Sequence, residues 1–378
     1  MSKEAKEVRT WIEIDKKALA HNVAQFLKLI PKKTRLMAVI KSNAYGHGLI
    51  LTAKVLLALR SFSEGGWFGV DSIVEALRML REGIKNPILV LGSKLPARTK
   101  EAAEQNITLT VSNSESLNSL MRTNKRIAFH LKVDTGMYRQ GFLPAEIFKL
   151  LNFLKRHKIF PQGIYTHFAS KDLGFPIYTK LQLSEFKKVL ADFEKAGFKN
   201  LIRHAAASNA TILFPESHFD MVRIGMGLYG YWPSLIAKVD HSPVTSLQPV
   251  LNWKTVVGEI KEIPGGSYLG YDLIEQVKRK TKIAVLPVGY WHGYCRALSS
   301  IGEVLIRGWR AKVLGRVSMD MIVVDVTDTP KVRVGDEVVL IGRQGREEIW
   351  ADELALKAST SEYEFLTRIN PLIRRVTK

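Results

Sequence analysis

The chain of 378 residues has a single cysteine, Cys295, and no apolar run long enough to span a bilayer. One cysteine cannot form an intramolecular disulfide, so the composition indicates a reducing compartment. The first ten residues, MSKEAKEVRT, are charged and lack the apolar stretch of a secretory signal. Together these absences predict a cytoplasmic protein that does not interact with a membrane.

Acidic residues are scarce relative to basic ones, since 36 Asp and Glu stand against 56 Lys and Arg and give a formal net charge of +20. Such an excess is common in proteins that bind nucleic acids. Here the basic residues are spread along the chain, and no basic run is interleaved with the aromatic residues that base stacking requires. We interpret the charge as a solvated basic surface and expect no specific nucleic-acid partner, while attraction of anionic substrates or polymers stays open.

Hydrophobic patterning divides the chain near residue 246. Before this point, short apolar runs alternate with segments of helical periodicity, and eight runs are predicted to be strands: 35–40, 67–70, 87–91, 107–111, 127–133, 162–167, 201–205 and 219–223. Eight strand–helix units within about 200 to 250 residues are typical of a (β/α)8 barrel. Beyond this point the segments are short, β-rich and separated by turns.

The prediction is therefore an α/β fold, in which a TIM-type (β/α)8 barrel is followed by a C-terminal mostly-β domain. The barrel domain is placed at residues 1–245, with first residues that could pair with the β domain, and the β domain at residues 246–378. Residues 233–249, with three prolines and little periodicity, are interpreted as the linker. Asp15 and Asp71 are predicted helix N-caps, and Gly83 is predicted to end the helix that Asp71 begins.

The segment LMAVIKSNAYGHG places Lys41 directly after the first predicted barrel strand. Active sites of barrels lie at the carboxyl ends of the strands, and a lysine held there against apolar side chains can form a Schiff base with a carbonyl cofactor. The small residues that follow let the backbone approach a ligand, and the hydroxyl of Tyr45 can bond a phosphate. Composition alone still favours an ordinary lysine at a strand end followed by a polar turn.

The string AVIKSNAYGHG closely resembles the lysine signature of alanine racemases, which use pyridoxal 5'-phosphate (PLP). The resemblance continues along almost the whole chain, in HLKVDTGMYRQGF (130–142), YTHFAS (165–170), HAAASNATILFP (204–215), MVRIGMGLYG (221–230), PVGYWHGYCR (287–296), GRVSMDMIVVDV (315–326) and YEFLTRI (363–369). It implies an isomerase that interconverts L-alanine and D-alanine with PLP and supplies D-alanine for peptidoglycan. It also implies a homodimer with shared active sites, and no metal.

The resemblance assigns roles to residues of the barrel. It implies that Lys41 carries PLP and is one of two bases, that Arg223 faces the pyridine nitrogen, and that His167 lies beside the cofactor. An always-charged arginine disfavours a protonated ring, which weakens the ring as an electron sink and limits side reactions. The remaining implied roles are cofactor contacts by Tyr45, Ser208, Gly225, Met226 and Tyr363, a substrate contact by Arg139, and a carbamate on Lys132 as in several members. For Ser208 a helix N-cap is the alternative.

A second base is needed on the opposite face of the planar carbanion, and two tyrosines of GSYLGYDLIEQ compete for this role. In the family, the catalytic tyrosine stands a fixed distance before a proline-x-glycine-tyrosine strand, and counting back from Tyr290 of PVGY selects Tyr271 over Tyr268. Simple packing of both rings across a sheet is the alternative. The resemblance implies that Tyr271, Tyr290 and the backbone of Met319 act in trans on the partner's site, with Tyr290 and Asp320 at the substrate entrance.

The chain departs from the family pattern at a few positions. The family more often has glycine in place of Tyr138 and asparagine in place of Ala207, and small and acidic residues in place of Trp291 and His292. These changes leave the substrate range open, so a racemase of another small amino acid such as serine is the first alternative. A PLP-dependent decarboxylase of the same fold is the second, although it would place an acid where Arg223 stands.

Overall fold

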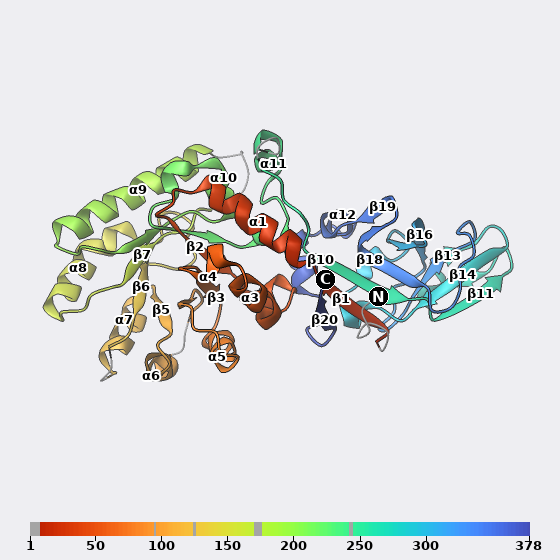
Figure 1. Cartoon of the computed structure of the whole chain (residues 1–378), viewed down its shortest axis with the longest axis horizontal. Coiled ribbons are helices and arrows are strands. Elements are labelled where there is room, and N and C mark those ends of the chain that lie inside the picture. The colour runs from red at the N-terminus through yellow and green to blue at the C-terminus, as the bar shows by residue number, and fades with distance from the viewer. Residues whose placement is uncertain (1–7, 94–95, 124–125, 170–175, 242–244) are drawn as a thin grey trace. The chain divides into compact units, whose positions relative to one another are not determined.

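The computed structural model describes residues 8–93, 96–123, 126–169, 176–241 and 245–378. The chain folds into two compact units (Figure 1). One unit comprises Ala18–Ser42 and Ala53–Gln248, and the other comprises 8–17, Asn43–Thr52 and Pro249–Lys378. The domain boundary predicted between residues 245 and 246 adjoins residues 242–244, which lie outside the described residues, so this boundary stays a prediction.

The first unit is built on a parallel eight-stranded sheet in the order β8-β7-β6-β5-β4-β3-β2-β9. Its strands confirm the eight predicted ones: β2 (Arg35–Val39), β3 (Trp67–Val70), β4 (Ile88–Val90), β5 (Thr108–Val111), β6 (Phe129–Lys132), β7 (Gly163–Tyr165), β8 (Ile202–His204) and β9 (Met221–Ile224). The two end strands meet where Arg223 N–H donates to Ala206 O at 3.0 Å. The sheet is therefore a nearly closed barrel, as predicted.

Helices follow the strands along the chain and bury apolar stripes. On α5, for example, Ile73, Ala76 and Met79 are buried at the spacing of one helix face. Besides α2 (Lys41–Tyr45), the α-helices of this part of the chain are α1 (Lys16–Leu29), α3 (Leu49–Leu57), α4 (Arg60–Ser63), α5 (Ile73–Arg81), α6 (Thr99–Glu104), α7 (Ser114–Met121), α8 (Ile147–Arg156), α9 (Pro176–Lys195), α10 (Ser208–Leu213) and α11 (Leu235–His241). Helix α11 lies within the segment interpreted as an irregular linker, whose residues 242–244 lie outside the described residues.

One of the two predicted N-caps is wrong. Asp15 accepts the N–H of Lys17 at 2.9 Å at the start of α1, as predicted. At α5 the N-cap is Ser72, whose side chain accepts the N–H of Glu75, and not Asp71. Asp71 is instead held outside the helix, because its own N–H donates to the Glu75 carboxylate at 2.8 Å.

The second unit holds a ten-stranded sheet with the path β11-β14-β17-β16-β15-β18-β10-β1-β20 and with β19 paired to β18. Strand β1, from the start of the chain, pairs antiparallel with β10 and parallel with β20. The sheet comprises β1 (Thr10–Ile14), β10 (Leu251–Val256), β11 (Glu259–Ile263), β14 (Thr281–Leu286), β15 (Glu303–Ile306), β16 (Trp309–Leu314), β17 (Ile322–Asp325), β18 (Glu337–Gln344), β19 (Glu347–Ile349) and β20 (Arg374–Thr377).

This unit is completed by a short hairpin and two helices: β12 (Tyr268–Leu269), β13 (Glu275–Gln276), α12 (Ala351–Lys357) and α13 (Glu362–Thr367). The large rings of Trp11, Trp253 and Tyr294 are fully buried in it. The predicted C-terminal mostly-β domain is confirmed. Within the described ranges, no helix combines the length and apolar content needed to cross a membrane.

Candidate active site

The chain leaves β2 through a left-handed helical turn, α2 (Lys41–Tyr45). The φ angles of Ser42, Asn43, Ala44 and Tyr45 are 55°, 56°, 55° and 51°. None of these residues is glycine, and left-handed helical backbone costs L-residues about 1–2 kcal/mol each. Such strain persists only where the surrounding structure fixes it, and it clusters at functional sites.

Hydrogen bonds from nearby segments hold this turn. Ser42 N–H donates to the Glu75 carboxylate at 2.7 Å, and the Asn43 side chain accepts the N–H of Leu49 at 3.0 Å. At the following Gly46, an added Cβ would lie 2.1 Å from the carbonyl oxygen of Leu366. The glycine of the motif is therefore required by close backbone packing as well as by its positive φ.

Lys41 lies at the carboxyl end of β2, where the sequence placed it. Its Nζ atom is 3.5 Å from Asp71 Oδ1, and its side chain is 38% exposed. Because Ser72 and not Asp71 caps α5, the carboxylate of Asp71 is available to Lys41. The amine is reachable from solvent at the end of the barrel where active sites of this fold lie.

Arg223, on β9, is the centre of a buried hydrogen-bond network. Its guanidinium donates to His204 Nδ1 at 2.8 Å, to His167 Nδ1 at 3.2 Å, and to the carbonyls of Thr166 and Ala205 at 2.8 and 2.9 Å. The side chain is only 3% exposed. Burial lowers the pKa of Arg223 to about 10, so it remains charged at neutral pH. The structure thus brings together the predicted residues Arg223 and His167.

The hydrogen bonds of Arg223 fix the tautomers of the histidines around it, because a guanidinium can only donate. Nδ1 of His204 must accept, so its proton is on Nε2, which donates to Nδ1 of His130 at 2.8 Å. Burial lowers the pKa of His130 to about 3 and that of His204 well below its ordinary value, so both rings are neutral. By the same reasoning His167 carries its proton on Nε2, where it can donate to another group.

Lys132 lies within electrostatic range of three other cations at this end of the barrel. Lys132 on β6 is buried, and its pKa is lowered to about 8 by burial and then by the neighbouring charges of Arg139, Arg223 and Lys41. The same cations, after burial, hold the pKa of His167 well below its ordinary value. A concentration of positive charge of this kind favours a bound anion.

Asp134 organises the loop that carries Arg139. Its two carboxylate oxygens accept five successive backbone N–H groups at 2.7 to 3.3 Å, those of Gly136, Met137, Tyr138, Arg139 and Gln140. Burial alone would raise the pKa of Asp134, but these bonds together outweigh it and lower the pKa. The sequence analysis missed this role, although an aspartate two residues before a glycine is a known turn signal.

Ser208 and Gly225 also lie together. The hydroxyl of Ser208 accepts the N–H of Gly225 at 3.0 Å and that of Gly227 at 3.5 Å. The N-cap of α10 is Ala207, so the alternative interpretation of Ser208 as a helix cap is wrong. Met226 is buried and begins the short 3-10 helix η5 (Met226–Tyr229) directly after this pair.

The second unit carries the other predicted residues. The rings of Tyr45 and Tyr363 pack edge to face with centroids 6.2 Å apart, so two predicted cofactor contacts lie side by side. Tyr271, Tyr290 and Met319 are 70%, 43% and 55% exposed. Tyr268 is 57% exposed as well, so exposure does not decide between the two candidate tyrosines.

Backbone and side-chain bonds connect the segments of these exposed residues. Tyr290 N–H donates to Ser318 O at 3.0 Å, next to Met319. Arg316 donates to the carboxylate of Asp272 at 3.0 Å, which ties the Tyr271 segment to the same region. Tyr271, Tyr290 and Met319 therefore belong to neighbouring segments of one unit.

Models of known protein families match both the barrel part and the β part of the chain. A family model described as the N-terminal domain of alanine racemase matches residues 14–233, and one described as its C-terminal domain matches residues 250–377. The chain is therefore an isomerase of the amino-acid racemase class.

Individual relatives narrow this class. An alanine racemase of Symbiobacterium thermophilum is 42% identical over 371 residues, which cover 97% of this chain and 96% of the relative. The crystal structure of alanine racemase from Bacillus anthracis with bound L-Ala-P is 33% identical, with a TM-score of 0.89 and coverage of 98% and 95% of the two chains. A solved structure of alanine racemase from Clostridium difficile 630 is 30% identical, with a TM-score of 0.90 and coverage of 98% of this chain and 96% of that one. The chain belongs to the alanine racemase family, and these likenesses support alanine racemase function.

Proposed function

We propose that the chain interconverts L-alanine and D-alanine with PLP as its cofactor and with two bases on opposite faces of the α carbon. The observation that carries the proposal is the buried Arg223 guanidinium, which bonds His167 at 3.2 Å within a group of cations that includes Lys41. The D-alanine produced would serve peptidoglycan synthesis.

The chemistry of the donor set fits PLP, which carries an anionic phosphate and an aldehyde. Lys41 offers a reachable amine at the end of β2. The hydroxyl of Ser208 and the backbone of Gly225 and Met226 would hold the phosphate, with Tyr45 and Tyr363. The cations of the barrel end would balance the negative charge of the cofactor and of the substrate carboxylate. Arg223 would face the ring nitrogen.

The protein's own residues would then divide the work of proton transfer. When bound, PLP supplies an aromatic ring that stabilises negative charge at the α carbon of an attached amino acid. Lys41 would hold or return the α proton at Nζ on one face, and the partner subunit's Tyr271 would do so at its phenolic oxygen on the other. Arg139 would orient the substrate carboxylate, and Arg223, always charged, would disfavour a protonated ring nitrogen and so limit side reactions.

A homodimer would supply Tyr271, Tyr290 and Met319 to the barrel of the other subunit. Support comes from the exposure of these side chains and of Trp291 and Met321, which are 57% and 54% exposed on the same segments. Exposed apolar side chains gathered in this way are typical of surfaces that another chain covers.

The test is the rate of D-alanine formation from L-alanine, measured by chiral chromatography, for the PLP-loaded protein and three variants. Lys41→Ala and Tyr271→Phe should each lower the rate by about 10² to 10⁴, because each removes one base. Tyr268→Phe is the matched control, since it removes a neighbouring hydroxyl of similar exposure, and it should keep the rate. Loss of activity in Tyr268→Phe but not in Tyr271→Phe would reverse the tyrosine assignment.

Attachment of the cofactor is tested separately. Borohydride reduction followed by peptide mass spectrometry should place the pyridoxyl group on Lys41, and Lys41→Ala should lose it. A labelled Lys41 with turnover of serine but not alanine would keep the chemistry and change the substrate. Absence of any labelled lysine would refute the cofactor assignment.

A further inference from the structure

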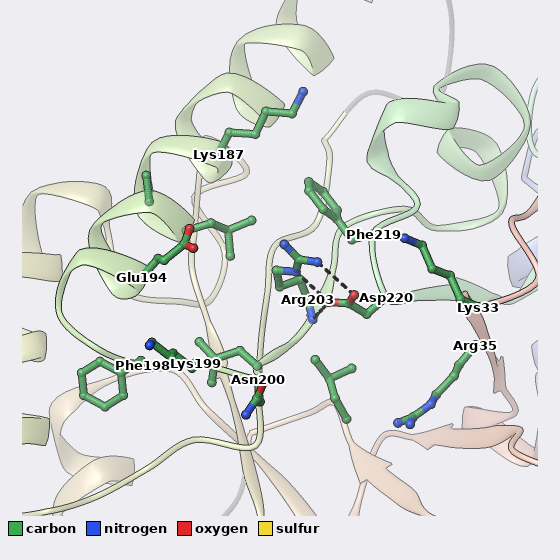
Figure 2. A pocket seen from close by; sticks show the side chains of 14 residues that line it. Lys33, Arg35, Lys187, Glu194, Phe198, Lys199, Asn200, Arg203, Phe219 and Asp220 are labelled. Atoms are coloured by element: carbon green, nitrogen blue, oxygen red, sulfur yellow. Dashed lines mark hydrogen bonds and ion pairs between the residues drawn. The ribbon is translucent and has the colours of Figure 1, made fainter.

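A cavity lies at the end of the barrel opposite to the candidate active site, between α9 and the beginnings of three strands (Figure 2). Its volume is about 820 Å³. Arg35 begins β2, which leads to Lys41, and Asp220 precedes β9, which carries Arg223. Because the strands are parallel, this groove is at their amino ends and is separate from the candidate active site. We call it the basal groove; it is lined by Lys33, Arg35, Lys187, Leu190, Ala191, Glu194, Phe198–Arg203, Phe219 and Asp220.

Positive charge dominates the basal groove. Its lining contains five basic residues and two acidic ones. Arg203 and Asp220 form a bidentate pair at 2.7 and 3.0 Å in the centre of the groove and neutralise each other. The remaining cations of the lining are Lys33, Arg35, Lys187 and Lys199. Among the described residues, no carboxylate oxygen lies within 4.0 Å of their charged nitrogens to form an ion pair.

Figure 2 shows how these cations are placed. Lys33 and Arg35 lie on one side of the Arg203–Asp220 pair, and Lys199 lies on the other side together with Glu194. Burial alone would raise the pKa of Asp220, but the hydrogen bonds from Arg203 outweigh it and lower this pKa. The positive charge of Lys33 is close enough to add to the lowering. Cations on two sides of a groove suit an anion with several charged groups, because each side can neutralise part of it.

The frame of the basal groove is fixed by backbone hydrogen bonds. Arg35 N–H donates to Asp220 O at 2.9 Å, and Asp220 N–H donates to Arg203 O at 3.0 Å. Phe219 and Asn200, which turn the chain at the rim, have left-handed φ angles of 47° and 62°. A preformed frame lowers the entropic cost of binding.

We propose that the basal groove binds a polyphosphate group, with Lys33, Arg35 and Lys199 as its ligands. Alanine does not fit this site, because a zwitterion with a single carboxylate offers too little negative charge for cations on both sides. The polyphosphate could be inorganic or part of a nucleotide. The apolar side chains of Leu190, Leu201 and Phe219 also line the groove and would contact the organic part of a nucleotide.

The test is calorimetric titration of the PLP-loaded protein with inorganic tripolyphosphate and with ATP at physiological ionic strength. The variant Lys33→Ala/Arg35→Ala/Lys199→Ala should bind both probes at least about tenfold more weakly, because it removes the charge-assisted bonds. The matched control Lys149→Ala/Lys155→Ala/Arg156→Ala removes the same charge from exposed positions on or beside α8 and should bind as the parent does. The single reversal Lys199→Glu is a second, less disruptive test and should also weaken binding.

The two probes distinguish the source of the group. Equal affinity for both would assign the phosphates alone, and tighter binding of ATP would assign a nucleotide. Equal binding by the two triple variants, no saturable binding by the parent, or competition between tripolyphosphate and alanine would overturn the proposal. The readout is heat of binding, so it does not depend on whether the chain racemises alanine. Racemisation by the groove variants should equal that of the parent.

Discussion

Lys132 is a buried amine whose pKa is lowered to about 8. Only a neutral amine attacks carbon dioxide; a nitrogen–carbon bond then forms and a proton is released. We predict that Lys132 takes up carbon dioxide increasingly as the pH rises through about 8, because protonation blocks the reaction below that value. The neighbouring charges of Arg139 and Arg223 would stabilise the resulting anion.

This prediction is measured by carbon-13 NMR of the protein in labelled bicarbonate between about pH 7 and pH 9. A carbamate signal should grow over this range, although the supply of dissolved carbon dioxide falls with pH and must be held constant. Lys132→Gln is the control and should show no signal. A signal of equal size in this variant would place the carbamate elsewhere.

At the scale of single residues, a candidate can be selected where its signal lies in one contiguous segment, but not where the fold brings its partner from far along the chain. Lys41 and Arg223 were selected from contiguous strings, and the structure places both at the same end of the barrel. His130 and His204 were not selected as partners, because 74 residues separate them and their contact exists only through the pairing of β6, β7 and β8. The roles of the individual site residues stay proposals.

At the scale of elements, the left-handed conformation of α2 predicts that a glycine in this turn stabilises the fold. Ser42 is exposed and has a φ of 55°, so Ser42→Gly removes a steric cost that only non-glycine residues bear. The substitution should stabilise the fold by about 0.5–1 kcal/mol after the greater entropy of the unfolded glycine is subtracted.

The matched control is Ser184→Gly, an exposed serine within the right-handed helix α9. There glycine should destabilise the fold by about 0.5 kcal/mol. Thermal unfolding of the two variants should therefore shift in opposite directions. A shift of the same sign in both would mean that the left-handed turn relaxes at little cost in the parent.

Helices and strands with a clear hydrophobic pattern could be predicted from the sequence. Elements whose conformation depends on contacts with distant segments could not. Most of the eight barrel strands, such as β4 (Ile88–Val90), are apolar runs because both faces of a parallel sheet are buried. The turn α2 could not be predicted from periodicity or propensity, since Ser42–Tyr45 adopt a left-handed conformation that non-glycine residues disfavour. Strand β20 has the sequence RRVT, and only its pairing with β1 makes it a strand.

At the scale of the whole molecule, shared active sites predict complementation between two inactive variants. Lys41→Ala and Tyr271→Phe each damage both sites of a homodimer. In a mixed dimer one site would hold both defects and the other would hold neither. Unfolding and refolding the two variants together should restore about a quarter of the parent activity, since half the dimers would be mixed and each would have one intact site.

The control is each variant refolded alone, which should stay inactive. Mixing without refolding tests whether subunits exchange in the native state. A refolded mixture with no more activity than its components would show that Lys41 and Tyr271 act within one chain, or that one of them is not a base.

The pairing of β1 with β20 has a consequence for how the chain is made. Strand β1 precedes the barrel strands in the chain, and its neighbour β20 is synthesised only after them (Figure 1). The barrel strands lie between them and pair mostly in sequence order, so they can assemble during translation. Until β10 and then β20 have been synthesised, β1 lacks its two partner strands, and a nascent chain with unpaired strand edges is open to pairing with other chains. The sheet of the second unit can therefore be completed only once β20 has been synthesised, after all eight barrel strands.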